Sequence, residues 1–414
     1  MVKVKPFKGY RPPKEYAKQI ASRPYDVLSS TEALREAGGN EMSLFHIIKP
    51  EIDFNNEVDE HDEQVYARAS ENLSKFIRNG WLRQDDKDCY YLYAQKMGEH
   101  IQYGIVVCAS VADYINGVIK KHELTRKDKE EDRKKHVRVT NANMEPVFFA
   151  YEDHPVLSQI VESVKALTPE YHFKAEDGIE HVFWIIDDED KMQSITKSFR
   201  GIKNFYIADG HHRSAAAALV GAEKMNGDLL GIHESESDYF MAVCFPKSEL
   251  KIMDYNRLVR DLNGLSDDEF FILLSRDFHI KESDIVRAHP SQSDEFAIYL
   301  SGRWFRIKAK EGTYDTQHPI ESLGAEICSR LILEKVLGIK DLRTDNRIDF
   351  VGGIRGYETL QSRVDSGEMR MAIGVCPVSM DQLIKVADTG NIMPPKSTWF
   401  EPKLRSGLVV HLLD

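Results

Sequence analysis

A short apolar run, a glycine turn and an alanine-rich segment at residues 204–219 constrain this chain more than any other stretch. The apolar residues at 205–207 favour a buried strand, and Gly210 permits the positive φ of a sharp reversal. Residues 215–219 are four alanines and a leucine, which are strong helix formers. The sequence therefore predicts a strand, a tight turn at Asp209-Gly210, and a helix.

The polar residues of this turn form a candidate anion site. They are Asp209, Gly210, His211, His212, Arg213 and Ser214. At a helix start, backbone N–H groups lack intrahelical partners and the helix dipole has its positive end. Arg213 and two imidazoles there favour a negatively charged ligand, phosphate first. The alternative is an ordinary charged helix cap, but bulky cations at a helix N-terminus oppose the dipole and need a reason.

Length and charge narrow the function classes. The 414 residues allow two or three domains, and the net charge of 55 − 67 = −12 argues against a general nucleic-acid or membrane binder. The cysteines are dispersed and odd in number, which favours free thiols in a reducing cytosol; they are Cys89, Cys108, Cys244, Cys328 and Cys376. We see no signal peptide and no apolar run long enough to span a bilayer, so we expect a cytoplasmic protein.

A second informative region begins at His122-Glu123. Thr125, with Asp128 at the capping-box position, predicts a helix that has no apolar side chain before Val137. A solvated helix is the default for such a segment. Glu123, placed where a loop meets the helix, can also serve as a general base or, with His122, as a ligand to a divalent cation.

Other elements are expected from apolar periodicity and turn residues. Strands are predicted at 44–48, 90–94, 104–109, 147–151, 181–186, 239–246 and 371–376, and a hairpin at 295–307. Helices are predicted at 29–37, 64–80, 192–199, 255–262, 267–276, 320–337 and 380–389, and a polar loop at 225–237. Composition shifts near Lys247, which suggests an N-terminal α+β region, 1–246, and a C-terminal α+β region, 247–414.

The stretch 393–407 is rich in proline, hydroxyl groups and cations. It begins Met393-Pro394-Pro395-Lys396-Ser397-Thr398. This composition predicts a rigid, locally basic lid or pocket wall. Lys396, Ser397 and Thr398 are candidate phosphate-binding residues, although the glycines of a P-loop are missing. An ordinary surface loop is the alternative.

These motifs in order resemble the bacterial and archaeal family called domain of unknown function ten-fifteen. The resemblance rests on Pro24-Tyr25-Asp26-Val27, His122-Glu123, the Asp209–Arg213 turn and Met393–Thr398, and it covers nearly the whole chain. The family name assigns no activity.

The turn also resembles, more remotely, the ParB/sulfiredoxin-like fold, which includes free-serine kinases and CTP-hydrolysing ParB proteins. By that resemblance we expect an α+β protein with a mixed sheet, flanking helices and a ParB/sulfiredoxin-like core around the turn. Glu123 would be the base, Asp209 a second catalytic residue, and His211, His212 and Arg213 would hold nucleotide phosphates. The two motifs lie 209 − 123 = 86 residues apart, so their meeting in space is open.

Three functions remain in view. The first is nucleotide-dependent phosphoryl transfer to a small hydroxylated metabolite, with ATP, ADP or CTP and Mg²⁺. The second is a ParB-like nucleotide-binding switch, and the third a metal-dependent hydrolase with His122, Glu123, His211 and His212 as ligands. We expect a nucleotide and a small molecule as partners rather than nucleic acid or a membrane, and a homodimer stays open.

Overall fold

The computed structural model describes residues 1–54, 58–227 and 235–414. Contacts divide the chain into two compact units: Met1–Lys121, Thr125–Leu250 and Pro402–Asp414 form the first, and His122–Leu124 with Lys251–Glu401 the second. These units differ from the predicted boundary at 246/247 mainly because the last thirteen residues group with the first unit. The division into two domains stays a prediction. The loop expected at 225–237 lies largely outside the described residues.

The first unit contains a mixed sheet. In order across it lie β6 (Ile119–Lys120), β11 (Phe205–Asp209), β8 (Val147–Tyr151), β12 (Tyr239–Pro246), β5 (His100–Ser110), β4 (Tyr90–Met97), β10 (Glu180–Ile186) and β9 (Tyr171–Lys174), and β1 (Val4–Lys5) pairs with β5. The pairs β11–β6 and β12–β8 are parallel, and the other pairs are antiparallel. The predicted α+β fold with a mixed sheet is therefore confirmed.

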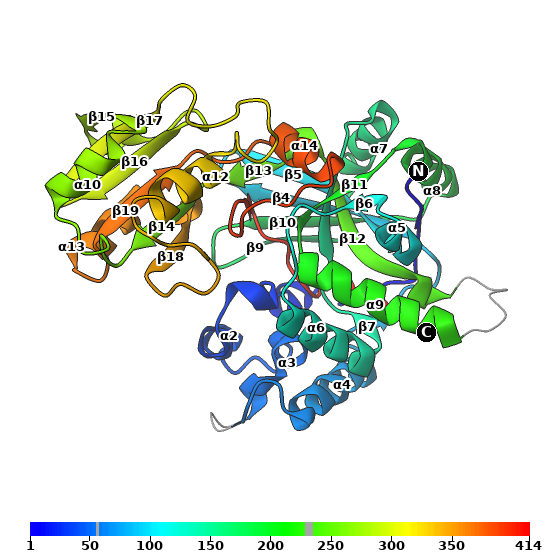
Figure 1. Ribbon diagram of the computed structural model, residues 1–414. Coiled ribbons are helices and arrows are strands. Elements are labelled where there is room, and N and C mark those ends of the chain that lie inside the picture. Colours follow the sequence, from blue (N-terminus) through cyan, green and yellow to red (C-terminus); the bar gives the residue numbers. More distant parts are fainter. Residues whose placement is uncertain (55–57, 228–234) are drawn as a thin grey trace. The chain divides into compact units, whose positions relative to one another are not determined.

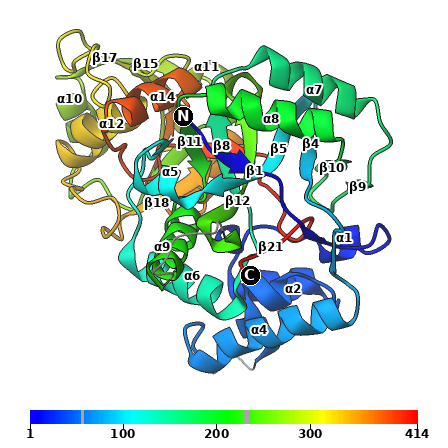
Figure 2. The ribbon, with the colours of Figure 1, turned by 90° about the vertical axis from the view of Figure 1, so that its right-hand side faces the viewer.

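Several helices pack apolar side chains against this sheet. α7 (Pro155–Lys165) and α8 (Glu189–Gly201) lie side by side and bury Leu157, Val164, Ile195 and Phe199 in the core (Figure 2). α6 (Lys127–Thr140) and α9 (His211–Gly227) also lie side by side (Figure 1). Small alanines on α9 let that helix approach the sheet, and α5 (Val111–Ile115) follows β5 directly.

Short elements near the N-terminus form a second core in the same unit. They are α1 (Ala17–Ile20), 3₁₀ turns at Tyr25–Val27 and Pro50–Asp53, α2 (Ser30–Ala37), α3 (Phe45–Ile48) and α4 (Glu63–Arg78), with the strand pairs β2 (Tyr10–Arg11)–β3 (Arg83–Gln84) and β7 (Ala142–Asn143)–β21 (His411–Leu412). The strand predicted at 44–48 is wrong, because this segment is the helix α3. A short apolar run fits a buried helical turn as well as a strand.

The second unit is built on an antiparallel sheet. Its order is β15 (Phe278–Ser283), β17 (Arg303–Ala309), β16 (Glu295–Leu300), β19 (Met371–Val375), β14 (Tyr255–Val259) and β18 (Ile348–Gly352), and β13 (Lys251–Met253) pairs separately with β20 (Trp399–Glu401). Its helices are α10 (Asp267–Leu274), α11 (Ile285–Ala288), α12 (Gly324–Cys328), α13 (Gly356–Asp365) and α14 (Met380–Asp388), and 3₁₀ turns lie at Lys247–Glu249 in the first unit and Gly353–Arg355 in the second.

Three local predictions are corrected here. Residues 255–262 do not form a helix: 255–259 are the strand β14, with every side chain buried on one face or the other. The helix predicted at 320–337 is shorter, since α12 passes into a π-helical turn at 329–334. The Thr125 capping box is absent, because Arg126 is the N-cap of α6 and the Thr125 hydroxyl donates to Glu130.

Two further sequence expectations concern the cysteines and membranes. All five cysteines are free, as their dispersed positions and odd number predicted, and four of them are buried. Among the described residues, no helix has the length and apolar character required to cross a bilayer.

Candidate functional site

The strand–turn–helix predicted from the sequence is present in the first unit. β11 ends at Asp209, and α9 begins at His211. Gly210 between them has φ +89°, a value at which any residue with a Cβ would be strained. Its carbonyl accepts the first helical bond, from the Ser214 N–H at 2.8 Å. The turn therefore presents the start of a seventeen-residue helix with no side chain on its cap residue.

Asp209 lies between two cations. Its Oδ2 is 3.3 Å from Nζ of Lys403 and 3.5 Å from Nη2 of Arg213. Burial raises the pKa of the Asp209 carboxyl, but the positive charges of Lys403 and Arg213 outweigh burial and bring it to about 2. Asp209 is therefore ionised at neutral pH. Sequence analysis did not select Lys403, whose only signal was its place in the cationic 393–407 stretch.

Arg213 is turned toward the protein rather than toward an open pocket. Nη1 donates to the carbonyl of Pro146 at 2.6 Å, and Nη2 lies 3.8 Å from Asp26 as well as near Asp209. The side chain is 7% exposed, and the cavity beside it measures about 30 Å³, which holds about two water molecules. The sequence analysis assigned Arg213 to phosphate, whereas these contacts favour a structural role that fixes the turn.

Ser214 and His212 also differ from what the turn pattern suggested. Ser214 is fully buried, and its hydroxyl oxygen has no hydrogen-bond partner among the described residues. His212 Nε2 accepts the backbone N–H of Arg126 at 3.0 Å, so it holds the start of α6. Burial lowers the pKa of His212, which keeps its imidazole neutral and able to accept at neutral pH.

The segment between β6 and α6 carries His122 and Glu123 past this turn. β6 pairs with β11 through Ile119 and Lys120, and Arg126 is bound by His212. Residues 121–125 lie between these two points, and contacts group His122–Leu124 among them with the second unit. Five residues span at most about 18 Å, which limits how far this segment can extend from its two ends.

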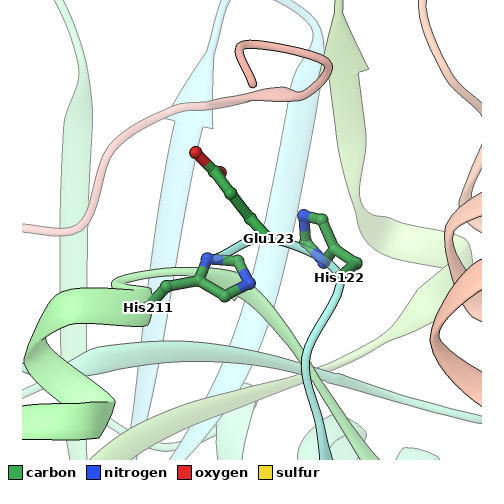
Figure 3. Close-up of side chains that lie close together, drawn as sticks. All are labelled: His122, Glu123 and His211. Carbon is green, nitrogen blue, oxygen red and sulfur yellow. The ribbon is translucent and has the colours of Figure 1, made fainter. Parts of the chain in front are cut away.

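His122, Glu123 and His211 come together. A ligand atom from each, two imidazole nitrogens and one carboxylate oxygen, lies within 4.8 Å of the others. Figure 3 shows His211 at the first turn of α9, with His122 and Glu123 on the connecting segment. His122 and His211 are buried, and Glu123 is half-buried. Two imidazoles and a carboxylate can bind a divalent cation, or the carboxylate can accept a proton.

The predicted residues near the C-terminus lie in the second unit. Lys396 is exposed and has φ +60°, and the Ser397 hydroxyl donates to the carbonyl of Pro394. Thr398 Oγ1 lies 3.3 Å from Nε2 of His122, and the Met393 N–H donates to the His122 carbonyl at 2.8 Å. Thr398 therefore contacts a member of the cluster, while the phosphate-binding role of all three residues stays a prediction.

Comparison with known families identifies one whose model matches most of the chain. The model of the family described as protein of unknown function (DUF1015) matches residues 4–326. The chain belongs to this family. The match confirms the predicted resemblance. The matched residues of this DUF1015 member include His122-Glu123 and the Asp209–Arg213 turn, while Met393–Thr398 lie beyond them. A search of curated proteins finds no match.

Solved structures offer distant likenesses to this DUF1015 protein. A free serine kinase in complex with AMP is 13% identical, covers 74% of this chain and 92% of its own, and has a TM-score of 0.35. A conserved hypothetical protein from Pyrococcus furiosus is 13% identical (74% and 95% covered, TM-score 0.33), and SbnI with a C-terminal truncation from Staphylococcus aureus is 10% identical (73% and 87%, TM-score 0.37). Likenesses this weak carry no argument about activity, and the ParB/sulfiredoxin-like core stays a prediction.

Proposed function

We propose that this protein is a phosphoryl-transfer enzyme in which Glu123 is the base and the start of α9 binds the phosphates of a nucleotide. The observation that carries the proposal is the grouping of Glu123 with His122 and His211, because His211 is the first residue of α9. A base and an anion-binding helix start are the two parts such a reaction needs next to each other.

The reaction balances with these groups. The acceptor hydroxyl gives its proton to the Glu123 carboxylate as its oxygen bonds to the terminal phosphorus of the nucleotide. The bond from that phosphorus to the bridging oxygen breaks, and the nucleotide leaves one phosphate shorter, as a diphosphate from ATP or CTP and as AMP from ADP. N–H groups in the first turn of a helix have no intrahelical acceptor, and those of α9 would stabilise negative charge on the phosphates. The acceptor class is a small hydroxylated metabolite, and the motif resemblance makes free serine the first to test.

The cluster's donor set limits what Mg²⁺ can do here. Mg²⁺ prefers an octahedral shell of oxygens and is usually bound through carboxylates, water and substrate phosphates. Two imidazoles and one carboxylate suit that ion poorly. Mg²⁺ therefore enters the proposal as the companion of the nucleotide phosphates rather than as an ion held by His122 and His211.

The same donor set favours a second candidate, a metal-dependent hydrolase. Two histidine nitrogens and a carboxylate oxygen are ligands that Zn²⁺, Mn²⁺ or Fe²⁺ accept. The three candidate ligands are His122, Glu123 and His211, since His212 is engaged with Arg126. In this alternative the bound cation would activate a water molecule, and no nucleotide would be needed.

A ligand screen tests the proposal against this alternative. Thermal unfolding is followed with ATP, ADP and CTP, each with and without Mg²⁺, and separately with Zn²⁺ and Mn²⁺. Release of the shortened nucleotide, a diphosphate from ATP or CTP and AMP from ADP, is then measured with serine present and absent. Stabilisation by a nucleotide together with acceptor-dependent release supports phosphoryl transfer. Stabilisation by Zn²⁺ or Mn²⁺ alone contradicts it and supports the hydrolase, and nucleotide stabilisation without turnover supports the switch.

A further inference from the structure

The second unit buries an arginine without a carboxylate partner. Arg257 on β14 is 0% exposed and is the bulkiest fully buried side chain among the described residues. Nη1 donates to the carbonyl of Tyr255, Nη2 donates to the carbonyl of Lys396 at 3.2 Å, and the guanidinium lies 5.6 Å from the centre of the Phe350 ring. Within residues 1–54, 58–227 and 235–414, no acidic side chain forms an ion pair with it.

Stability alone does not explain this side chain. Removing a charge from water costs several kcal/mol, and apolar residues of similar volume are often as stable or more stable. Burial accordingly lowers the pKa of Arg257. What the guanidinium provides and an apolar side chain cannot is a pair of directed donors, one of which reaches the 393–399 loop.

The hydrogen bond from Arg257 reaches a residue of this loop whose backbone conformation is strained. Lys396 has φ +60°, a left-handed conformation that costs an L-residue about 1–2 kcal/mol. Such conformations persist where surrounding contacts over-determine them. The bond from Arg257 to the Lys396 carbonyl is one such contact, and the bond from the Ser397 hydroxyl to Pro394 is another.

The far end of the loop is also fixed. The Trp399 ring packs edge-on against Tyr255 at 4.9 Å, and it lies over Gly352, where a Cβ would come within 2.8 Å of the indole. Thr398 is therefore held from both sides, with its hydroxyl 3.3 Å from Nε2 of His122. Hydroxyl or carbonyl partners on one ring nitrogen are how proteins set the orientation of a functional imidazole.

We propose that Arg257 is a positioning residue that fixes the orientation of His122 through the Lys396 carbonyl and Thr398. The inference deepens the proposed function, since it concerns a member of the same cluster. Its physical content, an anchored loop and an oriented ring, does not depend on which reaction the cluster performs.

The first test measures whether the loop is anchored. Trypsin can cleave after the exposed Lys396 only when the surrounding loop opens, and the fragment is identified by mass. In Arg257→Met we expect cleavage after Lys396 to rise about tenfold, which corresponds to about 1.4 kcal/mol of lost anchoring. Arg257→Lys, which keeps one donor, should give an intermediate rate. Arg303→Met is the matched control, because Arg303 is exposed and pairs with Glu282 in the same sheet. Wild-type cleavage in Arg257→Met would overturn the proposal.

The second test reads the His122 ring directly, without any ligand. Thr398→Val removes the hydroxyl and leaves the Lys396 carbonyl in place, so it should shift the His122 ring resonances without faster cleavage after Lys396. Arg257→Met should shift the same resonances, and Arg303→Met should not. If Arg257→Met fails to fold, the His122 resonances of Arg257→Lys and Thr398→Val test the proposal instead. Unchanged His122 resonances in these two variants would refute the proposal even if nucleotide turnover is found.

Discussion

The two units hold their buried cations in opposite ways. In the first unit, Arg213 is set among carboxylates, with Asp26 and Asp209 within 4 Å, and Lys403 shares Asp209 with it. In the second, Arg257 is completely buried and binds carbonyls. The first arrangement fixes the Asp209–Arg213 turn firmly, because several ion pairs must be broken before the turn can move. In the second arrangement, Arg257 holds the loop through one neutral acceptor, the Lys396 carbonyl, and breaking that hydrogen bond costs less free energy. The comparison teaches that ion pairs fix the Asp209–Arg213 turn, while a few bonds to neutral groups hold the loop that carries Lys396.

The largest expected effect comes from removing the cation of the first unit. Arg213→Met leaves Asp26 and Asp209 without their shared partner, and Glu145 lies buried nearby. Breaking a fully buried pair typically costs about 3–5 kcal/mol, and we expect the lower end of that range because both carboxylates are partly exposed and Asp209 keeps Lys403. Urea unfolding should show a loss of that size. Arg138→Met, at an exposed pair with Glu223, should cost less than about 1 kcal/mol. A small loss in Arg213→Met, with nucleotide binding abolished, would restore the sequence-based role of Arg213 as a phosphate ligand.

A smaller, pH-dependent effect is expected at Asp209. Its pKa is lower in the folded protein, about 2, than the ordinary 3.8, so the ionised carboxylate stabilises the fold. That contribution, on the order of 2 kcal/mol, is fully present above pH 4 and is lost as the pH falls through about 2. The difference in unfolding free energy between wild type and Asp209→Asn should be constant from pH 5 to 7 and shrink below pH 4. A difference that instead shrinks as pH rises would show that the sign is wrong.

The smallest effect concerns the strained residue of the second unit. Lys396→Gly relieves the left-handed conformation but adds chain entropy to the unfolded state. Thermal unfolding should therefore show between no change and a gain of about 1 kcal/mol. Asn263→Gly is the matched control, because Asn263 is also left-handed, at φ +57°, and asparagine tolerates that region better. A loss above 1 kcal/mol would mean that the Lys396 side chain, whose Nζ lies 5.6 Å from the Tyr255 ring centre, stabilises the fold by more than its backbone strain costs.

The sequence predicted some parts of these two units and missed others, and the reasons are physical. The strand–turn–helix at 205–227 followed from local chemistry: an apolar run, a glycine with positive φ, and alanines. The partners of Arg213 could not be foreseen, since Asp26 and Pro146 are distant in sequence and meet it only through the fold. Lys403 was missed for the same reason.

Errors in local structure have a related cause. Residues 255–259 contain an arginine among apolar side chains and gave no alternation, because both faces of β14 are buried. The sequence therefore predicted a helix at 255–262, where Arg257 in fact lies on a buried strand. The grouping of Glu123 with His211 was left open because the two residues lie 211 − 123 = 88 positions apart, and the sequence does not show the pairing of β6 with β11.

The most direct test of the account is turnover in Glu123→Gln, with Glu131→Gln as the control. Glu131 is an exposed glutamate that pairs with Lys134 on α6 and lies outside the cluster. The glutamine keeps the size of the side chain but cannot take a proton from the acceptor. We expect nucleotide binding by calorimetry to stay close to wild type, and acceptor-dependent release of nucleoside diphosphate to fall about 10²–10⁴-fold. Unimpaired release in Glu123→Gln, or an equal loss in Glu131→Gln, would contradict the role of Glu123 as base.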